Sequence, residues 1–128
     1  MSDITEADWK IFKSIREKAI ETYCQRCLAE YQEIIDRNES AHNRYLLMYR
    51  IVENLDKQME LIFQNLSRSK AILELIAIRG EGLADEALVS KLSPELQERT
   101  DPEKRGIRNF WLIKCQRCKE ENLSQRII

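Results

Sequence analysis

Apolar side chains recur three or four residues apart along most of the chain, which is the spacing of one helix face. The first such stripe contains Phe12, Ile15, Ala19, Cys24, Cys27, Tyr31 and Ile34. Thr5 precedes this stripe, and the acidic residues Glu6 and Asp8 follow directly after Thr5. This pattern is typical of a helix N-terminus. We therefore expect a first helix over residues 5–37, preceded by a short tail over residues 1–4.

A second stripe has the regular spacing of a heptad seam. It consists of Tyr45, Met48, Val52, Leu55, Met59, Ile62 and Leu66. Ser40 precedes it as an N-cap residue, and a short connection between two long helices favours an antiparallel hairpin. The seam is expected to pack within one chain or to form an interface with another. The interface candidates are Tyr45, Met48, Tyr49, Val52, Leu55 and Met59.

The later elements are shorter and are separated by glycine and proline. Helix is predicted over residues 40–79, either continuous or bent near 67–69, and Gly80 and Gly82 end it. Short helices are expected over residues 84–100, with Pro94 at a first helical position. In the C-terminal segment over residues 103–128, a helical spacing is formed by Ile107, Trp111, Cys115 and Cys118.

Glycine and proline are scarce, with three and two occurrences in 128 residues, and neither occurs before residue 80. Long uninterrupted helices are therefore favoured over turns and strands. We predict a single all-α domain over residues 1–128. Its fold is expected to be an irregular helical bundle built on a long antiparallel helix hairpin, with short C-terminal helices.

Charge is unevenly distributed, although the net charge is only −1. Residues 1–102 carry a net charge of −5 and residues 103–128 a net charge of +4. Basic residues with Phe110 and Trp111 among them are a pattern that binds nucleic acid through phosphate contacts and stacking. The alternative is an amphipathic helix whose aromatic residues are core. The nucleic-acid-binding candidates are Lys104, Arg105, Arg108, Lys114, Arg117 and Lys119.

No stretch of the sequence has the length and hydropathy of a membrane span. The N-terminus is acidic and lacks the apolar run of a signal peptide. A cytoplasmic protein without membrane association is therefore expected, and its four cysteines should be reduced or metal-bound.

The tetrapeptide Cys-Gln-Arg-Cys occurs twice, at residues 24–27 and 115–118. Four thiolates from Cys24, Cys27, Cys115 and Cys118 make a complete tetrahedral zinc set, which would join the C-terminal segment to the first helix. Each pair also falls on an apolar stripe, and free cysteine packs as a small hydrophobic residue. The expected cofactor is therefore none or a structural zinc ion.

Arg37 and His42, with Asn38 between them, form a short arginine–histidine motif, and His42 is the single histidine. This motif resembles that of HEPN-type ribonucleases, small all-α proteins in which the two residues from dimer-related subunits act on an RNA phosphate. The resemblance implies that Arg37 would hold the phosphate and His42 would act as acid or base. Tyr45 follows the histidine by three residues rather than two, which departs from the family pattern. The alternative is a helix–helix turn.

Several kinds of catalytic site are missing from the sequence. There is no glycine-rich phosphate loop and no nucleophile beside a base. The favoured hypothesis is a small non-enzymatic regulatory or adaptor protein that acts through protein–protein contacts, with another protein or as a homodimer. The alternatives are an RNA-cleaving or RNA-binding protein using Arg37 and His42, and a nucleic-acid-binding protein using residues 104–119.

Overall fold

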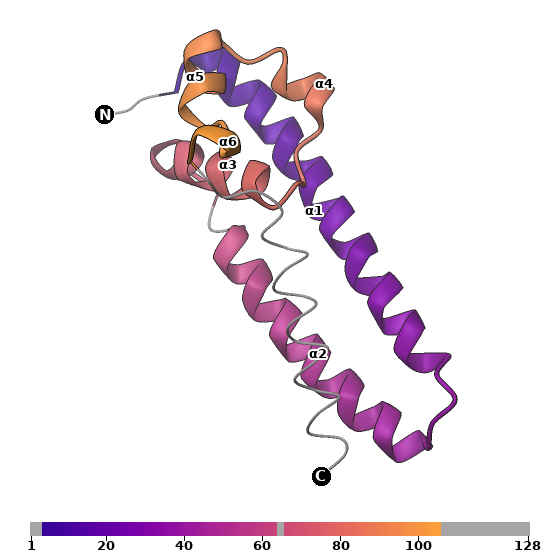
Figure 1. Cartoon of the computed structure of the whole chain (residues 1–128). Coiled ribbons are helices and arrows are strands. Elements are labelled where there is room, and N and C mark those ends of the chain that lie inside the picture. Colours follow the sequence, from indigo (N-terminus) through magenta and orange to yellow (C-terminus); the bar gives the residue numbers. More distant parts are fainter. Residues whose placement is uncertain (1–3, 64–65, 106–128) are drawn as a thin grey trace.

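The computed structural model describes residues 4–63 and 66–105, and throughout these residues it contains helices and turns but no strand (Figure 1). An antiparallel hairpin of two long helices carries four short helices beside the N-terminal half of α1 (Figure 1). The all-α class and the irregular bundle are confirmed. The helices are α1 (Glu6–Ile35), α2 (Ala41–Ile62), α3 (Ala71–Gly80), α4 (Glu86–Val89), α5 (Pro94–Arg99) and α6 (Pro102–Arg105), with a 3-10 turn at Arg68–Lys70.

Local capping sets the ends of the hairpin helices. The Thr5 hydroxyl accepts a hydrogen bond from the Asp8 backbone N–H at 3.1 Å, which starts α1. The Ser40 hydroxyl likewise accepts from the backbone N–H of Asn43 at 3.1 Å and starts α2. Between them, the Arg44 guanidinium donates to the Ile35 carbonyl at 2.7 Å, satisfying an acceptor that the end of α1 leaves open. The Arg44 side chain of α2 therefore binds the C-terminal end of α1 across the connection between the two helices.

α2 ends at Ile62, and the chain changes direction before α3. Phe63 has extended backbone angles, φ −107° and ψ 90°, and its ring contacts that of Tyr23 edge to face with centroids 6.0 Å apart. The chain becomes helical again after Ser67, whose hydroxyl accepts from the Lys70 backbone N–H at 3.3 Å. The helix predicted over residues 40–79 is thus two helices. The interruption lets α3 pack on α1 instead of extending α2 into solvent.

The core is built on one face of α1. Its C-terminal half packs on the α2 residues Leu47, Ile51 and Leu55, all buried. Its N-terminal half packs on α3 and α4. Burying each large apolar side chain contributes about 1.5–3 kcal/mol. The buried apolar residues of α1 are Phe12, Ile15, Ala19, Tyr23, Cys27 and Ile34.

The most apolar stretch, residues 71–78, lies within α3. This helix is ten residues long and is packed into the core by Ala71, Leu75 and Ile78. Among the residues that the structure describes, no helix combines the length and hydropathy needed to cross a bilayer.

Polar bonds from α1 fix the short helices in place. The Arg16 Nε donates at 2.6 Å to the carboxylate of Glu74, a side chain that is only 1% exposed. Nearer the N-terminus, the buried Asp8 carboxylate accepts from the Ser93 backbone N–H at 2.9 Å and from its hydroxyl at 2.7 Å. α3 and the start of α5 are therefore each joined to α1 by a polar contact.

A similar contact fixes the chain after α3. The Arg26 guanidinium donates to the backbone carbonyls of Glu81 at 3.2 Å and Gly82 at 3.0 Å. Gly82 has φ +71°, a left-handed conformation that glycine adopts without a steric penalty. Arg26 thus binds the turn at which the chain leaves α3 and passes towards α4.

Removing the partner of Glu74 should destabilise the fold in a pH-dependent way. Burial raises the pKa of Glu74, and Arg16 counteracts this effect. Arg16→Met should lower the free energy of unfolding by about 3 kcal/mol at neutral pH, because it leaves a buried carboxylate unpaired. A raised folded-state pKa favours folding at acid pH, and this contribution is lost as the pH rises through that pKa. The deficit should therefore shrink as the pH is lowered.

The measurement is urea unfolding of the parent and the variant across the pH range. Lys18→Met is the matched control, since it breaks the exposed ion pair with Asp85 at 2.6 Å and should have a much smaller effect. Equal losses of stability in the two variants at neutral pH would contradict the importance of the buried pair.

Candidate functional site

The predicted heptad seam of α2 is divided between the core and two surfaces. The buried face is centred on Leu47 and Ile51, which the seam did not contain, and on Leu55, which it did. Tyr45 and Tyr49 instead point to solvent. α2 is apolar over a wider arc than α1 can cover, so a substantial apolar area remains outside the core. Of the six predicted interface residues, Leu55 is the one that is fully buried.

The first surface, which we name the α2 ridge, consists of Tyr45, Leu46 and Tyr49. These side chains are 68%, 49% and 58% exposed, respectively. His42 precedes Leu46 by four residues and is exposed on the same side of α2. Large apolar and aromatic side chains grouped on one helix face are typical of protein-binding surfaces.

The second surface, which we name the hairpin face, lies along one side of the α1–α2 pair. α1 contributes Cys24, Leu28, Tyr31 and Ile35, which are spaced four, three and four residues apart. α2 contributes the half-buried Met48 and Met59 and the exposed Val52. Leu28 and Ile35 are also exposed.

On both helices, residues of this face directly follow buried ones, as Leu28 follows Cys27 on α1 and Val52 follows Ile51 on α2. In an antiparallel pair this equal offset places them on the same side. Burial is the main cause that raises the pKa of Tyr31 to about 12, and the charge of Asp56 on α2 raises it further. Asp56 follows Val52 by four residues, so it lies on the same side of α2. Tyr31 of α1 and the Val52 side of α2 therefore border one surface.

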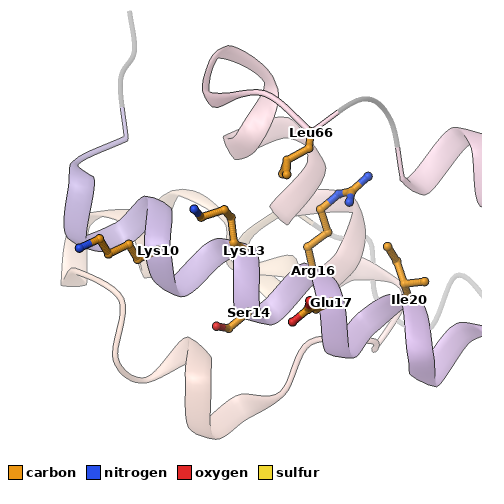
Figure 2. Close-up of a pocket in the computed structure, with 7 residues that line it drawn as sticks. All are labelled: Lys10, Lys13, Ser14, Arg16, Glu17, Ile20 and Leu66. Carbon is orange, nitrogen blue, oxygen red and sulfur yellow. The ribbon is translucent and has the colours of Figure 1, made fainter.

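The hairpin face continues into a hollow of about 520 Å³ beside the N-terminal half of α1 (Figure 2). Ile20 lines the hollow and precedes Cys24 of the hairpin face by four residues, so it connects the hollow to this face. Apart from Leu66, which lies between α2 and α3, the labelled side chains are spread along α1, and they do not converge on one point (Figure 2). Arg16 is paired with Glu74. The hollow therefore lacks the converging polar groups of a catalytic pocket. Its lining is Lys10, Lys13, Ser14, Arg16, Glu17, Ile20 and Leu66.

The first Cys-Gln-Arg-Cys pair is divided between two environments. Cys24 is half-buried on the hairpin face, whereas Cys27 is buried in the core. Burial is the main cause that raises the pKa of Cys27 to about 11, and this favours the protonated thiol. A zinc ligand must be a thiolate, so the environment of Cys27 fits a core residue better than a metal ligand.

The other half of the predicted zinc set lies outside the described residues, because it consists of Cys115 and Cys118. Within the part of the chain that the structure describes, no group of three or more histidine, cysteine, aspartate or glutamate side chains is placed to hold a metal ion.

Arg37 and His42 lie at the turn end of the hairpin in different settings. The Arg37 guanidinium is 3.7 Å from the carboxylate oxygens of both Glu33 and Glu39. His42 is exposed in the first turn of α2. The two carboxylates compete with a phosphate for Arg37, so phosphate binding would require these ion pairs to open.

The predicted basic segment lies largely beyond the described residues. Lys104 is exposed and its ammonium group is 2.7 Å from the Glu98 carboxylate, which raises the Lys104 pKa. The backbone of Arg105 ends α6. The other four candidates, Arg108, Lys114, Arg117 and Lys119, lie outside the described residues.

Comparison with known proteins assigns no relative: no protein-family model, curated protein or solved structure matches this chain. The candidate surfaces therefore rest on the geometry of the chain itself.

The sequence analysis did not identify Leu28, Ile35 and Leu46 as surface residues. The spacing of Leu28 and Ile35 with Cys24 and Tyr31 was visible as a second stripe of α1, adjacent to the stripe that forms the core.

The burial of Cys27 predicts a slow reaction with thiol reagents. With iodoacetamide at about pH 8, Cys27 should be alkylated at least about tenfold more slowly in the folded protein than in urea-unfolded protein, because the thiolate fraction falls as the pKa rises. Peptide mass spectrometry after timed quenching measures the rate at this residue alone. Alkylation of Cys27 at the rate of the unfolded chain would show that its thiol is accessible and ionised.

Proposed function

We propose that this protein is a small helical adaptor that acts through protein–protein contacts and self-associates through the α2 ridge. The observation that carries the proposal is the exposure of Tyr45, Leu46 and Tyr49 together on one side of a long helix. Tyrosine is favoured at interfaces because its ring buries a large apolar area while its hydroxyl keeps a hydrogen-bonding partner.

The charges that follow the ridge favour a second copy as its partner. Along the outer side of α2, Arg50, Glu53, Lys57 and Glu60 alternate in sign at intervals of three or four residues, and all four are exposed. Because the signs alternate, a second copy of this helix does not meet a continuous run of like charge beside the ridge. The ridge supplies the apolar contact, and the alternating charges avoid repulsion between identical helices.

Placing a charge on the ridge should dissociate the homodimer. Leu46→Glu should raise the dissociation constant of the dimer at least about tenfold, because a charge replaces a central apolar contact. Sedimentation velocity over a dilution series measures this constant. Leu73→Glu is the matched control, since Leu73 lies on α3 and is 69% exposed. A parent protein that is monomeric at every concentration, or equal dissociation by both variants, would count against the ridge as a dimer interface.

A second candidate function is cleavage of RNA at a dimeric site that contains Arg37 and His42. The observation in its favour is the position of His42, four residues before Leu46 and seven before Tyr49, on the ridge side of α2. Dimerisation through the ridge would bring the His42 side chains of two copies close together. An imidazole can then act as acid or base near an RNA phosphate once Arg37 leaves its carboxylate partners.

This second function makes a separate prediction for single-turnover RNA cleavage. His42→Ala should reduce the rate at least about a hundredfold, because general acid–base catalysis contributes a factor of that size. The dimer mass should be unchanged, since an exposed first-turn histidine is not a central apolar contact of the ridge. Cleavage by the parent and the variant at the same rate, or its absence from both, removes the nuclease function and leaves the adaptor proposal intact.

A further inference from the structure

The hairpin face is an apolar surface for which the described chain provides no cover. Leu28 is 63% exposed, Ile35 49% and Val52 41%. Leu28 and Ile35 lie towards the turn end of the hairpin, and Val52 lies at the middle of α2. The short helices α3 to α6 gather at the opposite end (Figure 1). A face of this kind, formed by two antiparallel helices, has the shape that a third helix covers in a bundle.

We propose that residues 106–128 of the same chain cover the hairpin face as a third helix, running parallel to α1 and antiparallel to α2. This inference concerns a surface that shares no residue with the α2 ridge, and it goes beyond the proposed self-association. The sequence predicts a helical stripe through Ile107, Trp111 and Cys115 in this segment.

The segment has the right starting point and length to cover this face. α6 ends at Arg105 and packs on α3, which is bound to α1 at Arg16, so the segment starts at the α3 end of the hairpin. Its 23 residues would form a helix roughly 35 Å long, and the 22 residues of α2 span roughly 33 Å. One helix can therefore cover the face from the α3 end to the turn.

The charges of the face and the segment are complementary in the half nearest α3. At the α3 end the face adjoins Lys10, Lys13 and Arg16 of the hollow. Next to these residues it is bordered by Glu17 and Glu21 of α1 and by Asp56 of α2, all exposed. The first part of the segment, residues 106–119, carries four basic residues and no acidic one. Opposite charges facing each other across the contact stabilise this orientation, whereas the reverse direction would leave them apart.

The turn half of the hairpin face and the last part of the segment are both apolar. Towards the turn, the hairpin face presents Leu28 and Ile35, with Val52 at the middle of α2. The last part of the segment contains Leu123, Ile127 and Ile128. The parallel direction with respect to α1 therefore pairs acidic with basic positions at one end and apolar with apolar positions at the other.

The same direction brings the second cysteine pair to the level of Cys24. Cys24 lies eight residues beyond Arg16, roughly 12 Å along α1, and Cys115 lies ten residues beyond Arg105, roughly 15 Å along a helix. Because Cys24 is half-buried on the hairpin face, its thiol is within reach of a helix lying on that face. Cys115 or Cys118 is then the neighbour expected for Cys24.

The test uses the full chain and measures trypsin cleavage after Arg108, Lys114, Arg117 and Lys119 by mass spectrometry. Leu28→Glu should accelerate cleavage at these sites about tenfold or more, because proteolysis follows the population in which the segment is released. Glu21→Lys should also accelerate it, through loss of charge complementarity, and Leu46→Glu on the ridge is the control that should not. Circular dichroism melting of each variant checks that the fold is retained.

Mild oxidation of dilute parent protein provides the second readout. A disulfide between Cys24 and Cys115 or Cys118 within one chain is expected, and Leu28→Glu should abolish it. Cleavage at the same rate in the parent and in both hairpin-face variants overturns the proposal. A Cys24 disulfide that forms only between two chains also overturns it, since the occupant is then a second copy. Loss of the dimer in Leu46→Glu without faster cleavage separates the ridge from the hairpin face.

Discussion

The structure depends on α1, a single helix that must bury its core-facing side against two different sets of partners. α2 covers the C-terminal half of α1, and α3 and α4 cover the N-terminal half. The short helices α4 and α5 have four and six residues, which is too short for a helix to be stable alone. Specific bonds to Asp8, Arg16 and Arg26 of α1 therefore fix the position of the segments after α2.

This division of α1 also explains why apolar surface remains exposed. Because α3 to α6 all gather beside one half of α1, the turn half of the hairpin consists, within residues 4–63 and 66–105, of two helices alone. Two packed helices bury one stripe each, yet α1 and α2 both carry a second apolar stripe next to the buried one. The hairpin face and the α2 ridge follow directly from this surplus. Exposed Leu28 and Tyr45 are thus consequences of the architecture and are available for contacts beyond residues 4–105.

The sequence predicted those features that depend on local chemistry. The caps at Thr5 and Ser40 were recognisable because capping involves residues only three positions apart. The rotation of α2 was not predictable from periodicity, since Leu47 and Ile51 form an apolar stripe as regular as that of Tyr45 and Val52. Only packing against α1 selects between them. The Asp8–Ser93 bond joins residues 85 positions apart, and no local pattern records it.

The two cysteines of the first Cys-Gln-Arg-Cys sequence lie in different environments. On α1, the spacing of three residues places Cys27 in the core and Cys24 on the hairpin face, so their thiols face different environments. A closed zinc site requires all its thiolates to converge on one ion, and two of the four predicted ligands, Cys115 and Cys118, lie outside the described residues. A small side chain such as that of Cys24 also allows close approach of a neighbouring helix. Cys24 would thus permit close packing of a third helix on the hairpin face, as the proposed cover of this face requires.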